Sequence, residues 1–139
     1  MKISLPSISD QQKFIFEAAT KEAIATLQSN LQAPALPAQQ EVNEDQYSRN
    51  HLLRQDEGWE APPTDIVGAY FRHFQMHFPE YGTDAQLGTL LGLRGKQRDR
   101  RIRSFKDGSA VVPYDLWRRF LIITGRVPQD VIKVLAYMA

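Results

Sequence analysis

Basic residues crowd into one short stretch of this 139-residue chain. Residues 94–106 contain seven basic residues and a single acid, Asp99, so the stretch carries a net charge of +6. The whole chain has a net charge of +1, so the remaining residues carry −5, most of it between Glu41 and Glu60. Such a basic stretch favours a polyanionic partner, although a solvated helix face would give the same pattern.

The types of these residues indicate nucleic acid as that partner. A helix over residues 96–106 has only Ile102 and Phe105 to anchor it to a core, so its other sides stay polar. Arginine can bond guanine through two donors, glutamine can read adenine, and both basic residue types bind phosphate. We expect base contacts from Gln97, Arg100, Arg101, Arg103 and Ser104. We expect phosphate contacts from Thr83, Gln86, Arg94, Lys96 and Lys106, with the helix beginning at Thr83 contributing its N-terminus.

Residues 83–108 resemble the helix-turn-helix of the lambda-repressor-like (Cro-type) DNA-binding family. The first motif helix and turn of that family are similar to residues 83–93, TDAQLGTLLGL, where Ala85 is the small residue expected to face the partner helix. The end of its recognition helix is similar to residues 102–108, IRSFKDG. Residues 112–125, VPYDLWRRFLIITG, resemble the helix that follows in phage- and plasmid-borne members. The resemblance covers residues 65–125 and implies a domain that reads the major groove.

The sequence departs from the family pattern at two places. Leu93 and Ile102 are separated by eight residues, where the family has about four, and four extra residues make about one helical turn. Either the recognition helix begins one turn earlier or the turn before it is longer. Asp84 stands where the family often has a glutamine that contacts phosphate. Because an acid is unfavourable beside DNA, Gln86 or the helix N-terminus is expected to take that role.

The apolar periodicity predicts a small all-α bundle containing this helix-turn-helix, preceded by a helical arm and an acidic linker. The predicted regions are a helical arm at 1–33, a linker rich in proline and acids at 34–62 and a DNA-binding domain at 63–139. Helices are expected at 11–31, 65–78, 84–91, 96–106, 114–124 and 131–138.

The N-terminal arm is expected to bind a partner, because its apolar side around Phe14 and Ala18 is too narrow for a core of its own. It can pack on the DNA-binding domain, on a second copy or on another protein. We favour a homodimer through the arm, the C-terminal helix or both, since dimers place two recognition helices in successive major grooves, about 34 Å apart. The acidic linker is also a candidate to shield the basic helix within one chain.

Other kinds of chemistry find little support in the sequence. Cysteine is absent, and His73 and His77 stand four apart without further ligands, so no metal site is expected. Nucleophile-elbow, P-loop and dinucleotide-binding motifs are missing, so we expect no enzyme and no cofactor. There is no apolar run of the roughly 20 residues that span a membrane, and no secretory signal, which favours a cytoplasmic protein without membrane contact.

The leading interpretation is therefore a sequence-specific double-stranded DNA-binding protein. The resemblance implies a transcriptional regulator carried by a phage, a plasmid or another mobile element. The alternative is a non-enzymatic adaptor, such as a component of a conjugation or phage assembly complex, whose basic helix binds an acidic protein.

Overall fold

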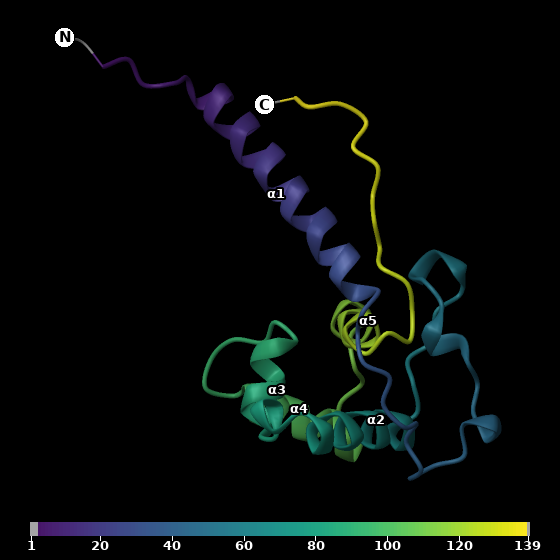
Figure 1. The fold of residues 1–139 in the computed structure, drawn as a ribbon. Coiled ribbons are helices and arrows are strands. Elements are labelled where there is room, and N and C mark those ends of the chain that lie inside the picture. The colour runs from purple at the N-terminus through teal and green to yellow at the C-terminus, as the bar shows by residue number, and fades with distance from the viewer. Residues whose placement is uncertain (1–2, 139) are drawn as a thin grey trace. The chain divides into compact units, whose positions relative to one another are not determined.

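The chain folds into helices and irregular segments, as predicted. A computed structural model describes residues 3–138, and its regular elements in that range are all helical (Figure 1). The chain divides into two compact units. The first comprises the residues up to Pro37 together with those from Val131 onward, and the second comprises Ala38–Asp130. The predicted all-α class is confirmed.

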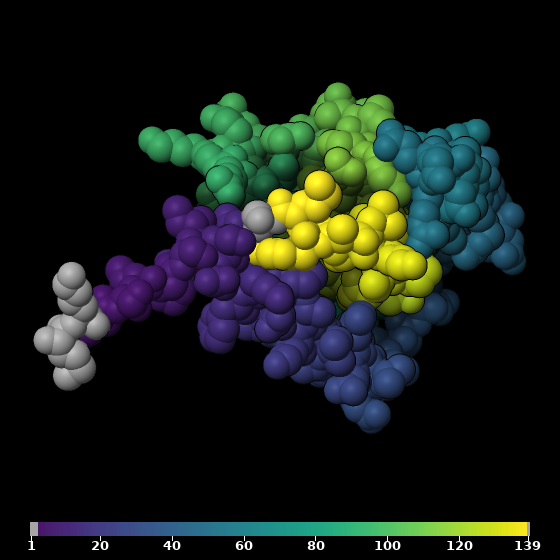
Figure 2. Space-filling model, turned by 90° about the horizontal axis from the view of Figure 1, so that it is seen from above, coloured from purple at the N-terminus to yellow at the C-terminus, as the bar shows by residue number. Residues whose placement is uncertain are grey.

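The first unit consists of one long helix and an extended C-terminal segment. Helix α1 spans Ile8–Asn30, and the hydroxyl of its N-cap, Ser7, accepts a hydrogen bond from the amide of Asp10 at 3.1 Å. The C-terminal segment lies along α1, with the Tyr137 hydroxyl donating to the Ser9 carbonyl at 3.3 Å. The rings of Phe16 and Tyr137 are 5.5 Å apart. Figure 2 shows this segment in yellow against the purple helix.

The helix predicted at 131–138 is wrong, because these residues have no regular secondary structure. The segment is short and contains three β-branched residues, Val131, Ile132 and Val134, which lower helix propensity. The carboxylate of Asp130, placed to cap such a helix, instead accepts hydrogen bonds from Arg54 at 3.0 Å and from Arg118 at 3.0 and 3.1 Å.

The second unit has one aromatic core. Its helices are α2 (Thr64–His77), α3 (Asp84–Leu90), α4 (Arg98–Asp107) and α5 (Tyr114–Ile123), with a short 3₁₀ turn, η4 (Pro79–Tyr81), between α2 and α3. Phe71 and Phe74 of α2 meet Phe120 of α5 edge to face, and Trp117 stacks on Tyr70. The predicted helices at 65–78, 84–91 and 114–124 are confirmed to within about a residue, which fits helix ends set by local caps.

Most of the predicted linker is folded against the second unit. Residues from Ala38 onward belong to the second unit, whose bounds therefore differ from the predicted domain at 63–139. Three 3₁₀ turns form here: η1 (Glu44–Gln46), η2 (Asn50–Leu52) and η3 (Gln55–Glu57). We call residues 39–60 the strap, because several of its side chains pack against the core. The partly buried apolar residues of the strap in contact with the core are Val42, Tyr47, Leu52 and Trp59.

His51 is the buried centre of the strap. Its Nδ1 accepts a hydrogen bond from Trp117 Nε1 at 3.2 Å, and its carbonyl accepts one from Trp59 Nε1 at 3.2 Å. Burial lowers the pKa of His51 to about 4, so the ring is neutral at pH 7 and its Nδ1 can accept the hydrogen bond from the indole N–H. The strap is therefore held through specific polar contacts as well as apolar ones.

Two acids at the start of the strap pair with side chains of α2 rather than of α4. Glu41 accepts from Arg72 Nε at 2.8 Å, and Glu44 accepts from the Tyr70 hydroxyl and from Gln39. Burial raises the pKa of Glu44, but the bonds from Tyr70 and Gln39 outweigh it and leave that pKa lowered. The prediction that the acidic linker shields the basic helix is therefore wrong for these two carboxylates.

Candidate nucleic-acid interface

Helix α3 begins with a reciprocal cap formed by two of the predicted phosphate-binding residues. The Thr83 hydroxyl accepts from the Gln86 amide at 3.2 Å, and the Gln86 side-chain oxygen accepts from the Thr83 amide at 3.1 Å. These bonds satisfy two donors that the first turn of a helix leaves without partners. Both residues are exposed, but these oxygens serve the helix itself.

The extra residues of the motif lie in the turn. Helix α3 ends at Leu90 and α4 begins at Arg98, two residues later than predicted, so the connection is a seven-residue turn. Gly92 and Gly95 have φ values of 89° and 90°, a left-handed conformation that favours glycine. The sequence left two alternatives open, and the longer turn is the one that the structure adopts.

The two helices of the motif cross closely at Gly88. A Cβ added there would lie 3.2 Å from the Cβ of Arg98 and 3.3 Å from its carbonyl oxygen. Ala85, the residue expected at the crossing, contributes its carbonyl, which accepts from Arg98 Nε at 3.2 Å. Ile102 and Phe105 are fully buried, so the predicted anchors of α4 are confirmed.

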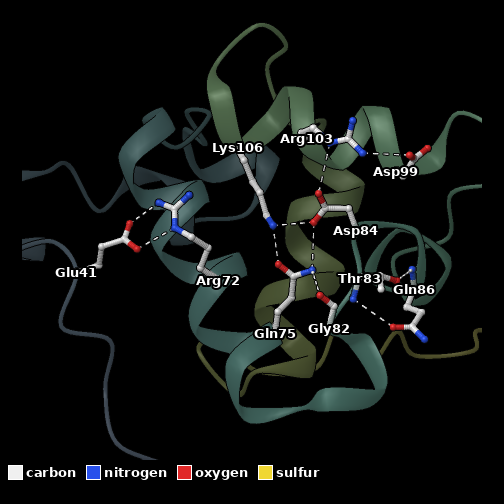
Figure 3. Close-up of polar contacts among 10 residues, drawn as sticks. All are labelled: Glu41, Arg72, Gln75, Gly82, Thr83, Asp84, Gln86, Asp99, Arg103 and Lys106. Atoms are coloured by element: carbon white, nitrogen blue, oxygen red, sulfur yellow. Dashed lines mark hydrogen bonds and ion pairs between the residues drawn. The ribbon is translucent and has the colours of Figure 1, made fainter.

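Asp84 ties three helices together by its carboxylate (Figure 3). Lys106 Nζ of α4 lies 2.7 Å from Asp84 Oδ1 and 2.6 Å from the side-chain oxygen of Gln75 in α2. Gln75 also donates to Asp84 at 3.2 Å, and Arg103 Nε lies 3.8 Å from the second carboxylate oxygen. Burial raises the pKa of Asp84, but the bonds from Lys106 and Gln75 and the nearby cations hold it below its usual value.

This cluster changes the roles expected for two basic residues. The Lys106 side chain is only 17% exposed and points inward to Asp84, so it is not placed as the sequence predicted for a phosphate contact. Arg103 remains 60% exposed, but its Nη2 donates to Asp99 at 3.1 Å. The Asp84 side chain thus avoids an exposed position at the motif's surface, which the sequence could not show.

The remaining predicted contact residues lie on the exposed side of α4 and in the turn before it. Arg94, Lys96, Gln97, Arg100 and Arg101 are exposed, and Ser104 is half-buried. The Ser104 hydroxyl donates to the Arg100 carbonyl at 2.8 Å, and the Arg101 guanidinium lies 5.7 Å from the centroid of the Phe105 ring. We call the exposed cations Arg94, Lys96, Arg100, Arg101 and Arg103 the basic face.

Sequence reasoning missed one further cation near the basic face. Arg119 of α5 is exposed, and its Nε donates to the Leu90 carbonyl at 2.8 Å. This bond satisfies a carbonyl at the end of α3, next to the turn that carries Arg94 and Lys96. The spacing of 29 residues between Arg119 and Leu90 leaves no local signal for this contact.

Neither a cluster of metal ligands nor a membrane-spanning helix is found in the part of the chain that the structure describes. The rings of His73 and His77 lie 4.6 Å apart, yet no group of three or more potential metal ligands occurs among the described residues. None of the helices within residues 3–138 is long and apolar enough to cross a membrane.

No family model, curated protein or solved structure matches this chain. The resemblance to the lambda-repressor-like family therefore stays a prediction that rests on the motif residues.

Proposed function

We propose that the second unit binds double-stranded DNA, with α4 in the major groove and the turn 91–97 against the phosphate backbone. The observation that carries this proposal is the two-sided character of α4. One side is anchored through Ile102 and Phe105, and the other side exposes Arg100, Arg101 and Arg103. A helix held in this way can enter a groove about 12 Å wide without exposing the core.

The dimensions and chemistry of α4 suit base reading. Its ten residues span about 15 Å, which reaches a few base pairs. Arg100 and Arg101 are the main base-reading residues in this proposal, with Gln97 and Ser104 beside them. Arg94 and Lys96 contact phosphates, where bound counterions are released. Arg103 is held at the edge by Asp99 and Asp84, which orients its guanidinium.

We further propose that DNA binding is sequence-specific and regulates transcription. Non-covalent occupancy of a site needs no catalytic group, and a small basic-faced domain fits that role. An origin in a phage, a plasmid or another mobile element rests on the motif resemblance alone.

The proposal can be tested by fluorescence anisotropy on a randomised duplex pool at two salt concentrations, followed by sequencing of the bound fraction. Arg100→Ala is expected to weaken binding to the selected site by about 1–3 kcal/mol and to relax preference at one position. Lys96→Ala is expected to weaken binding to all sequences alike and to reduce the salt slope by about one. Arg49→Ala is the matched control, because it removes an exposed arginine from the strap.

Two outcomes would overturn parts of this proposal. If the protein does not bind duplex DNA at low salt, the DNA proposal fails, and an acidic protein becomes the expected partner of the basic face. If DNA binds without enrichment of any sequence, the proposal of a sequence-specific regulator fails, and an architectural role in DNA binding replaces it. An equal loss in Arg49→Ala and Arg100→Ala would show that only net charge matters.

A further inference from the structure

We infer that α1 binds α1 of a second copy in antiparallel orientation, with the two-fold axis level with position 19 along the helix. This interface lies wholly within the first unit and does not depend on DNA binding by the second.

Helix α1 lacks a covering on most of its surface. None of its described residues is buried, and Phe14 and Ile24 are 73% and 52% exposed. The C-terminal segment covers only the side that carries Phe16, which contacts Tyr137 and is 37% exposed. The uncovered apolar side chains therefore need another protein surface, since large exposed apolar patches mark interaction sites.

The uncovered face follows helical spacing and is narrow. Phe14, Glu17, Lys21 and Ile24 recur at intervals of three or four residues and share one face. Ala18 and Ala25 flank that line on one edge. The two alanines leave room for the backbone of a second helix to approach closely.

The charges on this face select both the partner and its orientation. In an antiparallel pair whose two-fold axis is level with position 19, Glu17 of each copy lies opposite Lys21 of the other, and Phe14 lies opposite Ile24. Both contacts occur twice, as a two-fold interface requires. In a parallel pair in register, Glu17 would meet Glu17 and Lys21 would meet Lys21, which is repulsive. The face is thus complementary to itself in one orientation only.

Reversal of single charges in the full-length chain tests this register. Glu17→Lys places lysine opposite lysine at both contacts, and Lys21→Glu places acid opposite acid. Each variant alone is expected to dimerise about tenfold more weakly than the unchanged chain in sedimentation velocity. A mixture of the two variants, one carrying a mass tag, is expected to form heterodimers, because every contact then joins opposite charges.

The mixture separates the interface from effects within one helix. Glu17 and Lys21 also stand at i and i+4, so each single variant loses the same intrahelical pair. Mixing cannot restore that pair, and recovered association must come from contacts between chains. Glu22→Lys, an equal charge change on a neighbouring side of α1, is the matched control and should leave dimerisation unchanged. Circular dichroism checks that helix content is equal in all variants.

A monomeric unchanged chain would overturn the inference. Dimerisation that is insensitive to Glu17→Lys and Lys21→Glu would also overturn it, as would a mixture that forms no heterodimer. Each readout is association of the protein in the absence of DNA, so its failure is distinct from failure of the proposed DNA binding.

Discussion

Asp84 determines which residues of the basic stretch face solvent. Its carboxylate holds Lys106 inward and lies near Arg103, whereas Arg100 and Arg101 are exposed. The acid that weakened the resemblance to the helix-turn-helix pattern therefore has a structural role. It fixes α4 to α2 and α3, so the position of the basic face depends on a residue outside that face.

Asp84→Asn is expected to lower the free energy of unfolding by about 1–3 kcal/mol at pH 7, because Lys106 loses its anionic partner in a partly buried position. The lowered pKa of Asp84 makes this contribution fully present above its usual value of 3.8 and lost as the pH falls through the lowered value. Urea titrations at pH 7 and below pH 3.8 measure the difference between the two proteins, which should shrink in acid. Asp45→Asn, in the exposed turn η1, is the control. An undiminished difference in acid would contradict the ion-pair explanation.

Residue pairs of this kind lie beyond prediction from the sequence. The charges of residues 94–106 and the anchors Ile102 and Phe105 could be predicted, since both follow from local composition and period. The inward position of Lys106 could not, because its partners Asp84 and Gln75 lie 22 and 31 residues away. Proximity of that kind is created only when the helices pack.

At the scale of elements, the close crossing at Gly88 fixes the position of α4 against α3. Gly88→Val is expected to destabilise the second unit by about 2 kcal/mol, because its side chain meets the backbone of Arg98 in a packed crossing. Chemical denaturation measures the loss. Thr89→Val introduces the same residue type at the next, exposed position of α3 and should cost much less. Equal stability of the two variants would show that the crossing can widen freely.

The strap and the C-terminal segment show where element prediction from the sequence ends. Residues 34–62 combine proline, alanine, glutamine and acids with no apolar period, which predicts a linker, yet residues 39–60 are folded against the core. Their order comes from single contacts, such as His51 with Trp117 and Tyr47 with Asp65. For the C-terminal segment the error is the reverse, because a regular element is predicted where none forms. Its apolar residues suggest a helix, which β-branching and short length disfavour.

At the scale of the whole molecule, the near-neutral net charge conceals a separation of acids from bases within the second unit. Glu41 and Glu44 are bound to α2 and its neighbours, whereas the cations of the basic face are exposed. The strap is therefore part of the folded unit, and two of its acids pair with side chains of α2. The fragment that folds should then include the strap and need not include α1.

Two fragments test this division of the chain. Residues 38–130 are expected to unfold cooperatively, because this fragment keeps the core and every strap contact with it. Residues 63–139, the domain predicted from the sequence, lack His51 and Trp59 and leave the indole of Trp117 without its acceptor. Loss of these buried groups should lower the free energy of unfolding by about 3 kcal/mol or more relative to residues 38–130. Urea titrations followed by tryptophan fluorescence and circular dichroism measure both. If residues 63–139 proved as stable as residues 38–130, the strap would be a passive covering, and the basic face would be held by the four helices α2 to α5 without it.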